Sequence, residues 1–321
     1  MMLDNLLRVL ADGAFHSGSE LGRTLGISRS AVWKHMQRLQ ELGVEVYSVK
    51  GRGYRIPGGL DLLDEADLQQ LLPQPVRDRL GQLVLTVETD STNTRALDAM
   101  QAGLTAGLFA SEYQHSGRGR RGRQWVSPLG SSLCFSLAWR FNSGAAALEG
   151  LSLAVGLALQ QALTQEGLVN IGLKWPNDLL VNDAKLGGIL IELSGDAAGE
   201  CQVAIGIGLN VQLPEAMVEQ LDQPCVDLTQ LGYSGSKTQL LATVVSELIH
   251  MLERFETSGF APLRSAWEEA NAFRGREVAL TSGPRRYEGV CLGVTDQGGL
   301  RLQTSAGQEV FHGGEMSVRL Q

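Results

Sequence analysis

The sequence predicts an α+β protein made of three successive parts, on three observations. Residues 1–60 contain two short helical patterns followed by a basic hairpin. Residues 61–273 contain apolar strands interspersed with helices, and residues 274–321 contain short alternating strands separated by glycine-rich turns. A chain of 321 residues is long enough for two or three domains. We therefore expect a winged helix-turn-helix domain at 1–60, a mixed-sheet domain at 61–273 and a small β-barrel at 274–321.

Charge is unevenly distributed along the chain, whose net charge is −8. Residues 1–60 carry eight Lys and Arg against five Asp and Glu, whereas the remainder is acidic. A basic head on an acidic body predicts that nucleic acid is contacted by the head alone.

The four cysteines stand far apart, without neighbouring histidines. This spacing predicts a reduced, cytoplasmic protein with no dedicated protein site for a metal. The first residues show neither a signal peptide nor a membrane span, so we expect no membrane partner.

Residues 19–42 predict the helix-turn-helix. Gly26 permits the tight turn, and Val32, Met36 and Leu39 repeat at helical spacing as a buried stripe. The second helix then presents a polar and basic face, on which Trp33 and His35 are expected to be packing or structural residues and not base readers. The DNA-contacting side chains predicted in this helix are Ser28, Arg29, Ser30, Lys34, Gln37 and Arg38.

Residues 44–56 predict two short strands joined by a basic, glycine-rich turn, which is the wing of a winged helix. Lys50 and Arg52 in this turn are expected to reach DNA phosphates. The competing interpretation is a small helical domain with a solvated charged face.

The central region predicts a mixed sheet with helices on one side. A long buried helix is expected at 148–166. The strand candidates are 83–88, 106–112, 132–139, 171–175, 178–181, 185–193 and 202–209.

The most unusual segment of the central region is Ser116–Arg123, with four arginines and three glycines. Glycines let the backbone approach a ligand closely, and guanidinium groups match carboxylate and phosphate oxygens. The segment alone is equally compatible with a nucleic-acid patch or a solvated loop.

Four further clusters surround this segment in the sequence, and each alone is compatible with an ordinary cap or turn. They are Asp90-Ser91-Thr92-Asn93, Lys174-Trp175-Pro176-Asn177-Asp178, Lys185-Leu186-Gly187-Gly188 and Gly206-Ile207-Gly208-Leu209-Asn210. With Gln114 and the arginine segment up to Trp125, in this order, they resemble the biotin protein ligase signature. With the winged helix in front, the chain resembles the bifunctional biotin protein ligases and biotin operon repressors of bacteria from end to end.

The resemblance implies a central domain similar to class II synthetases and an SH3-like barrel at the C-terminus. It implies that biotin and ATP, with Mg²⁺, give biotinoyl-5′-AMP, and that the biotin carboxyl carrier protein of acetyl-CoA carboxylase then accepts the biotinoyl group on a lysine. The biotin-binding residues implied are Ser91, Thr92, Asn93, Gln114, Gly117, Arg118, Gly119, Arg120, Lys185 and Gly188.

The resemblance also assigns the nucleotide and the chemical steps. The nucleotide contacts implied are Arg121, Arg123, Trp125, Asn177, Asn210 and Arg319. Arg118, Arg120 and Lys185 are expected to neutralise the two reacting anions, and Asp178 is expected to orient the acceptor lysine or take its proton. A carboxylate on such a turn is equally compatible with a hydrogen-bonding brace.

As a repressor, the protein is expected to form a homodimer through strand 189–193 when it holds the adenylate, and then to bind operator DNA. Three alternatives remain open at this point, and one is a ligase whose head no longer recognises an operator. A lipoate protein ligase uses related chemistry on a related fold, and a biotin-sensing repressor binds its ligand without reacting.

Overall fold

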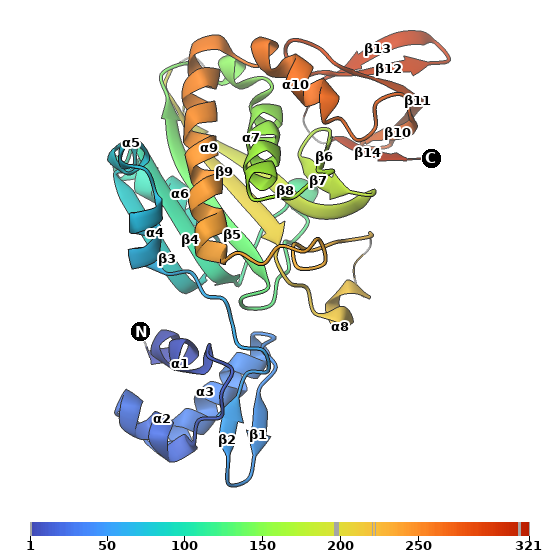
Figure 1. Cartoon of the computed structure of the whole chain (residues 1–321). Coiled ribbons are helices and arrows are strands. Elements are labelled where there is room, and N and C mark those ends of the chain that lie inside the picture. Colours follow the sequence, from blue (N-terminus) through green and yellow to red (C-terminus); the bar gives the residue numbers. More distant parts are fainter. Residues whose placement is uncertain (1, 196–198, 220, 222, 314–315, 321) are drawn as a thin grey trace.

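The computed structural model describes residues 2–195, 199–219, 221, 223–313 and 316–320. The chain forms a small N-terminal head, a large central body and a C-terminal sheet beside the body (Figure 1). The two chemistry-bearing regions predicted from the sequence therefore lie in different parts of the molecule.

The head consists of α1 (Met2–Leu10), α2 (Gly18–Leu25), α3 (Arg29–Glu41) and a hairpin of β1 (Tyr47–Val49) and β2 (Gly53–Arg55). Ser28 caps α3 by accepting a hydrogen bond from the Ala31 amide, and Gly26 ends α2 in the left-handed conformation that glycine tolerates. The predicted stripe of Val32, Met36 and Leu39 is buried. The helix-turn-helix and its wing are confirmed.

Two short helices, α4 (Glu65–Leu71) and α5 (Gln74–Arg79), lead from the head into the body. The body is built on a seven-stranded sheet with strand order β3-β4-β5-β9-β8-β7-β6. Only the β3–β4 pair is parallel, so the sheet is mixed as predicted. Its strands are β3 (Gln82–Thr89), β4 (Ala106–Gln114), β5 (Ser132–Phe141), β6 (Gly172–Lys174), β7 (Asp178–Val181), β8 (Ala184–Gly195) and β9 (Cys201–Asn210).

Helices cover both faces of this sheet, which corrects the expectation of helices on one side. α7 (Leu151–Gln165) and α9 (Lys237–Ser258) pack together on one face. α6 (Thr92–Gln101) packs Ala96 and Met100 against Phe109, Ala138 and Ala204 on the other. Successive strand residues point to opposite faces, so the buried strands have apolar residues on both.

One segment of the described chain, Ala145–Gln165, is long and apolar enough to cross a membrane by length and composition alone. It comprises the 3₁₀ turn η2 (Ala145–Leu148) and α7. Most of its apolar side chains are buried between the sheet and α9, where they form the centre of the core.

The C-terminal part is an antiparallel sheet of five strands in the order β13-β12-β11-β10-β14. Within the described residues, no backbone ladder joins β13 to β14, so the sheet is not a closed barrel. The strands are β10 (Glu277–Ser282), β11 (Arg285–Val294), β12 (Leu300–Thr304), β13 (Gly307–Phe311) and β14 (Met316–Leu320). Helix α10 (Arg264–Glu269) and the 3₁₀ turn η3 (Ala261–Leu263) connect this sheet to α9.

Candidate active site

A cavity of about 210 Å³ opens at the arginine-rich segment of the central body. Strands β7, β8 and β9, the N-terminus of α6 and strand β14 all contribute to its wall. The cavity brings together nearly all the predicted ligand residues: Ser91, Thr92, Asn93, Gln114, Arg118, Gly119, Arg120, Arg121, Arg123, Trp125, Asn177, Asp178, Lys185, Gly188, Asn210 and Arg319. Gly117 lies just outside it, where a side chain would collide with the Trp125 carbonyl.

One end of the cavity is a buried network of hydroxyl and amide groups. The Gln114 side-chain oxygen accepts hydrogen bonds from the Thr92 amide at 2.8 Å and from its hydroxyl at 3.2 Å. The Ser136 hydroxyl lies 2.7 Å from Thr92 Oγ1 and 2.5 Å from Asn93 Oδ1. Glu192 Oε2 accepts from Asn93 Nδ2 at 2.7 Å. Because these side chains are fixed by one another, this end is preorganised to hydrogen-bond a small polar ring.

Two glycines of β9 give this wall its shape. A Cβ on Gly206 would overlap the Asn93 carboxamide, and a Cβ on Gly208 would lie 2.6 Å from the Trp125 ring. Without side chains at these positions, Asn93 and Trp125 lie directly on the strand. Trp125 therefore forms an aromatic surface next to the polar end of the cavity.

The arginine-rich segment is folded back on itself. Gly119 donates to the Arg123 carbonyl at 2.7 Å, and Trp125 donates to the Gly117 carbonyl at 2.9 Å. Arg121 has a φ of 61°, a conformation that few non-glycine residues adopt. The segment includes the 3₁₀ turn η1 (Arg120–Gly122) and is largely exposed.

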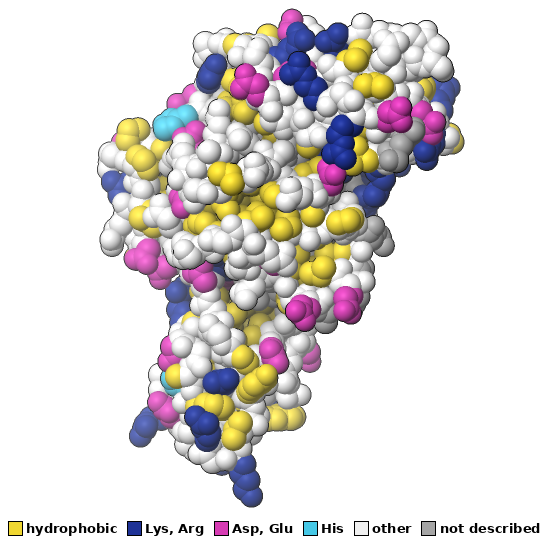
Figure 2. All heavy atoms as spheres, turned by 45° about the vertical axis from the view of Figure 1, so that its right-hand side comes forward, with side chains coloured by type: hydrophobic (Ala, Val, Ile, Leu, Met, Phe, Trp, Pro, Cys, Tyr) yellow, Lys and Arg dark blue, Asp and Glu magenta, His cyan; other side chains and the backbone are white. Residues whose placement is uncertain are grey.

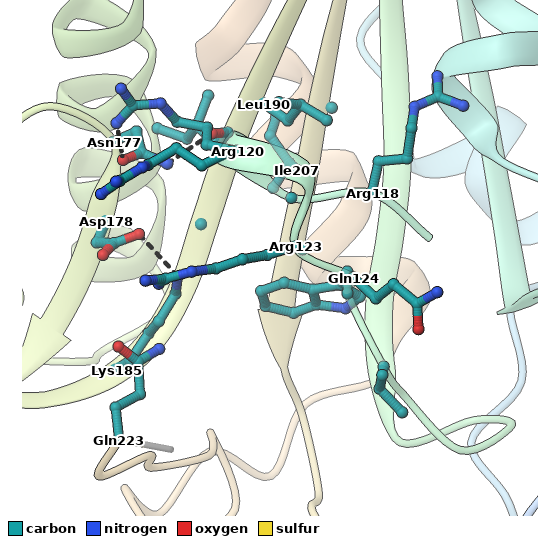
Figure 3. Close-up of a pocket in the computed structure, with 18 of the residues that line it drawn as sticks. Arg118, Arg120, Arg123, Gln124, Asn177, Asp178, Lys185, Leu190, Ile207 and Gln223 are labelled. Atoms are coloured by element: carbon teal, nitrogen blue, oxygen red, sulfur yellow. Dashed lines mark hydrogen bonds and ion pairs between the residues drawn. The ribbon is translucent and has the colours of Figure 1, made fainter. Parts of the chain in front are cut away.

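Its arginines point in different directions (Figure 3). Arg120 donates to Asn177 Oδ1 at 2.8 Å, and Arg123 reaches across the cavity towards Asp178 and Lys185. Arg118 turns away and binds Thr94 Oγ1 at 2.8 Å and Glu192 Oε2 at 2.7 Å. Burial lowers the pKa of the Arg120 guanidinium. Of the segment's four arginines, Arg120 and Arg123 therefore face the cavity centre and Arg118 does not.

Asp178 is held between two ammonium groups. Its carboxylate oxygens lie 2.9 Å from Lys174 Nζ and 2.8 Å from Lys185 Nζ. Burial opposes ionisation of this carboxyl, but the charges of Lys185 and Lys174 outweigh it and lower its pKa. Two cations are thereby fixed at one side of the cavity, where an anionic group would be stabilised.

Backbone contacts fix the remaining polar residues. Asn177 Nδ2 donates to the Ile189 carbonyl at 2.9 Å, and Asn210 Nδ2 donates to the Lys185 and Val226 carbonyls at 3.1 Å. The backbone of Lys185 pairs with residues 224 and 226. Arg319 reaches the cavity from β14, so the C-terminal sheet takes part in the site.

The sequence analysis includes Lys174 in a motif without giving it a role, and it misses two residues of the polar network, Ser136 and Glu192. Lys174 opens the motif that ends at Asp178, where its charge and its distance of four residues from that carboxylate were a usable signal. Ser136 and Glu192 lie inside apolar strands, where no local pattern marks them. Their roles depend on strand pairing across the sheet.

The described residues contain no group of three or more His, Cys, Asp or Glu that could hold a metal ion. The carboxylates nearest the cavity, Asp178 and Glu192, are already paired with cations. The side chains therefore do not fit a magnesium ion held by the protein itself, since Mg²⁺ requires free oxygen ligands.

The predicted DNA-contacting residues lie on α3 and on the wing of the head, and one of them, Arg38, contacts the body. Arg29, Lys34 and Gln37 are exposed on α3, and Lys50 and Arg52 are exposed on the wing. Basic side chains project from this end of the molecule (Figure 2). The Ser28 and Ser30 hydroxyls are 2.9 Å apart at the start of α3.

Two residues of the helix differ from the others. The Arg38 guanidinium binds Glu88 of β3 at 2.8 Å and Glu41 at 3.2 Å, so it connects the head to the body. Trp33 does not pack in a core, because 53% of its surface is exposed. The expectation that Trp33 is a packing residue is therefore corrected.

Comparison with known proteins accounts for all three parts of the chain. Residues 86–210 match the model of the biotin/lipoate A/B protein ligase family, residues 3–55 match an HTH domain, and residues 273–319 match the biotin protein ligase C-terminal domain. The solved structure of the biotin protein ligase from Aquifex aeolicus in complex with biotin and ATP superposes with a TM-score of 0.65 at 27% identity. The superposition covers 75% of this chain and 100% of the Aquifex aeolicus chain.

Two relatives align over nearly the whole chain. The bifunctional ligase/repressor BirA of Escherichia coli is 40% identical, over 98% of this chain and 96% of its own length. The protein of the same name from Bacillus subtilis is 30% identical, over 96% of this chain and 95% of its own. The chain therefore belongs to the bifunctional ligase/repressor family of biotin protein ligases.

Proposed function

We propose that this protein activates biotin with ATP to biotinoyl-5′-AMP, transfers the biotinoyl group to a carrier-protein lysine, and represses transcription through its head. The observation that carries the ligase activity is the meeting of five separate sequence clusters around one cavity. That cavity has a preorganised polar end, an aromatic surface and a cationic side, in this order. These are the features needed for a ureido ring, a nucleotide and two reacting anions.

At the polar end, we assign the ureido ring of biotin to Ser91, Thr92, Asn93 and Gln114, with Gly117, Gly119 and Gly188 giving backbone access. Hydrogen-bonded sites of this kind reject analogues that lack the bonding groups. The lipoate ring has no ureido group, so the polar network supports biotin over lipoate as the substrate. For the nucleotide we assign Arg121, Arg123, Trp125, Asn177, Asn210 and Arg319.

In the first step, a biotin carboxylate oxygen attacks the α-phosphorus of ATP and pyrophosphate leaves. Both reactants are anionic, so their approach requires fixed positive charge. Arg120, Lys185 and Lys174, which line the cavity, supply it in this proposal. Arg118 is proposed to join them by leaving its ion pair with Glu192 when the ligands bind. Mg²⁺ is proposed to arrive bound to the phosphates of ATP, because the described protein residues at the site form no magnesium site of their own.

In the second step, the neutral amine of the carrier lysine attacks the biotinoyl carbonyl carbon and AMP leaves. The amine gives up one proton to solvent water as the amide forms, and AMP departs as the anion. The lowered pKa of Asp178 makes it a weak base, and its two ion pairs favour the role of a brace for Lys174 and Lys185. The proposed acceptor is the biotin carboxyl carrier protein of acetyl-CoA carboxylase.

The regulatory function is proposed to use the head. We assign DNA contacts to Ser28, Arg29, Ser30, Lys34, Gln37, Lys50 and Arg52, and assign Arg38 to the contact with the body because Glu88 and Glu41 engage it. A homodimer formed by the adenylate-bound protein through residues 189–193 would present two heads to a two-fold operator.

We place the domain boundaries at 1–60, 61–273 and 274–321, and we regard the C-terminal sheet as an SH3-like module whose barrel is open. We also place the protein in the cytoplasm, where its substrates and the chromosome meet.

The direct test is exchange of labelled pyrophosphate into ATP in the presence of Mg²⁺ and biotin, beside a sample with lipoate. Exchange with biotin alone is the expected result. Exchange only with lipoate would reassign the substrate, and no exchange with either would leave a sensor that binds without reacting.

A further inference from the structure

Trp33 is an exposed aromatic residue on the polar and basic side of α3. Arg29, Trp33 and Gln37 are spaced four residues apart, so they form one stripe along the helix. The buried stripe of Val32, Met36 and Leu39 runs along the adjacent side of the helix, so Trp33 stands beside the core and is not enclosed by it. The indole is 53% exposed and is not part of the head's hydrophobic core as the structure describes it.

An exposed indole between polar neighbours gains stability when an apolar surface covers it. The neighbours on its helix define what can approach. Arg29 and Lys34 are cations, and Gln37 is an amide that can read a base edge. Phosphate contacts by the cations would place the helix in the major groove, with Trp33 against the base edges.

Only one base presents an apolar group in the major groove, and that is thymine with its 5-methyl group. We propose that Trp33 contacts the 5-methyl group of a thymine in each operator half-site and thereby sets specificity at that base pair. This inference rests on the proposed repressor function. It adds a specificity-determining residue to a face otherwise made of charged and amide groups.

The wing offers the strongest alternative. Tyr47 and Val49 of β1 are also exposed, at 44% and 40%. Trp33 together with these side chains could instead cover an apolar patch of a partner protein. The basic residues around Trp33 favour DNA, since the guanidinium and ammonium groups match phosphates.

The experiment is selection of DNA from a pool of duplexes with a randomised central region, using the full chain with biotin, ATP and Mg²⁺. The unaltered protein is expected to enrich a two-fold motif with an invariant A·T pair in each half-site. The Trp33→Ala protein is expected to lose the preference at that pair alone. Lys34→Ala is the matched control and is expected to select the same motif. It should lower the slope of log affinity against log salt concentration by the amount that corresponds to about one phosphate contact.

A second measurement changes the DNA instead of the motif-selecting protein, and it uses Trp33→Ala as the control. In the enriched duplex, thymine is replaced by uracil at the invariant pair, which removes only the methyl group. We expect the unaltered chain to bind about fourfold more weakly, as for one buried methyl group, and Trp33→Ala to show no difference.

The outcomes separate the two proposals. If the unaltered chain enriches no sequence, operator binding itself is wrong, and the inference about Trp33 falls with it. If a motif is enriched and the unaltered chain binds thymine and uracil equally, Trp33 does not read a methyl group, and only this inference is overturned. The inference is also overturned if Trp33→Ala selects the same motif as the unaltered chain, and the exposed indole is then left to a partner protein.

Discussion

Individual charges at the active site explain why Asp178 matters more as a positioning group than as a base. Its two oxygens are each committed to one lysine, and its depressed pKa reflects that pairing. Proton transfer works best from a group whose pKa lies near the working pH. A carboxyl whose pKa lies below its ordinary value of 3.8 is far from neutral pH.

Asp178→Asn is therefore expected to slow adenylate formation by about 10- to 100-fold, because Lys174 and Lys185 lose the anion that holds them in place. Single-turnover formation of the adenylate and its transfer to carrier protein are measured separately. Asp183→Asn is the matched control, since Asp183 pairs with Arg276 outside the cavity. Normal adenylation combined with slow transfer would restore the role of proton acceptor to Asp178.

The site residues that could be predicted from the sequence are those in short polar motifs, whereas those inside apolar strands could not. Arg120, Asn177, Lys185 and Gly188 occur in short polar motifs, which are conspicuous in the sequence, and the cavity contains them all. Glu192 pairs with both Asn93 and Arg118, but it lies in a strand whose neighbours are apolar. Its partners are more than 70 residues away in the chain. Such contacts are set by the pairing of strands, which no local pattern reports.

At the scale of single elements, two glycines of β9 leave room for two residues of the cavity wall. Asn93 packs against Gly206, and Trp125 packs against Gly208. Gly206→Ala is expected to raise the KM for biotin, because Asn93 is held by Ser136 and Glu192 and cannot move aside. Gly208→Ala is expected to raise the KM for ATP by displacing Trp125. Each effect should be roughly tenfold, the equivalent of about 1.4 kcal/mol of overpacking.

Steady-state kinetics with each substrate varied in turn separates the two variants. Gly156→Ala on α7 is the control, since its Cβ would meet only ordinary contacts at 3.6 Å. Equal effects of both β9 variants on both substrates would show that the strand does not divide the cavity in this way.

Helix α9 was not predicted from the sequence. Its first residue, Lys237, has an environment that the sequence does not indicate. Lys237 is 1% exposed and its ammonium pairs with Glu112, which is 5% exposed. Glu112 also accepts from the Leu63 amide at 2.6 Å, and the lysine donates to the Gly130 carbonyl at 3.3 Å. Charged residues usually lie at the surface, so the sequence gives no reason to expect Lys237 to be buried. Its contacts with the linker and the sheet therefore could not be predicted.

Lys237→Met is expected to lower the free energy of unfolding by about 3–5 kcal/mol, because it leaves the Glu112 carboxylate buried without a cation. Adding Glu112→Gln should recover more than half of that loss, since the amide removes the charge and keeps an acceptor for Leu63. Urea unfolding measures both. Arg264→Met, which breaks the exposed pair with Asp296, should cost less than about 1 kcal/mol. A double variant as unstable as the single one would contradict this account.

At the scale of the whole molecule, the head contacts the body directly, in addition to the linker that joins them. Leu129 of the body packs in the head's hydrophobic core and donates to the Leu42 carbonyl at 3.0 Å. Glu88 on β3 binds Arg38 of the head at 2.8 Å and lies 3.0 Å from His115, which directly precedes the arginine-rich segment. Head, sheet and the start of that segment therefore meet at one carboxylate.

This arrangement predicts that Arg38 acts on the position of the head and contributes little to phosphate binding. Arg38→Ala should leave the slope of log operator affinity against log salt concentration unchanged. Lys34→Ala should lower that slope by the amount that corresponds to about one phosphate contact. Arg38→Ala and Glu88→Gln should both accelerate hydrogen exchange in α3, because each removes the same ion pair, and combining them should add little. If Arg38→Ala instead lowers the salt dependence as Lys34→Ala does, the guanidinium leaves Glu88 when DNA binds. The ion pair would then compete with the operator, and Glu88→Gln would strengthen DNA binding.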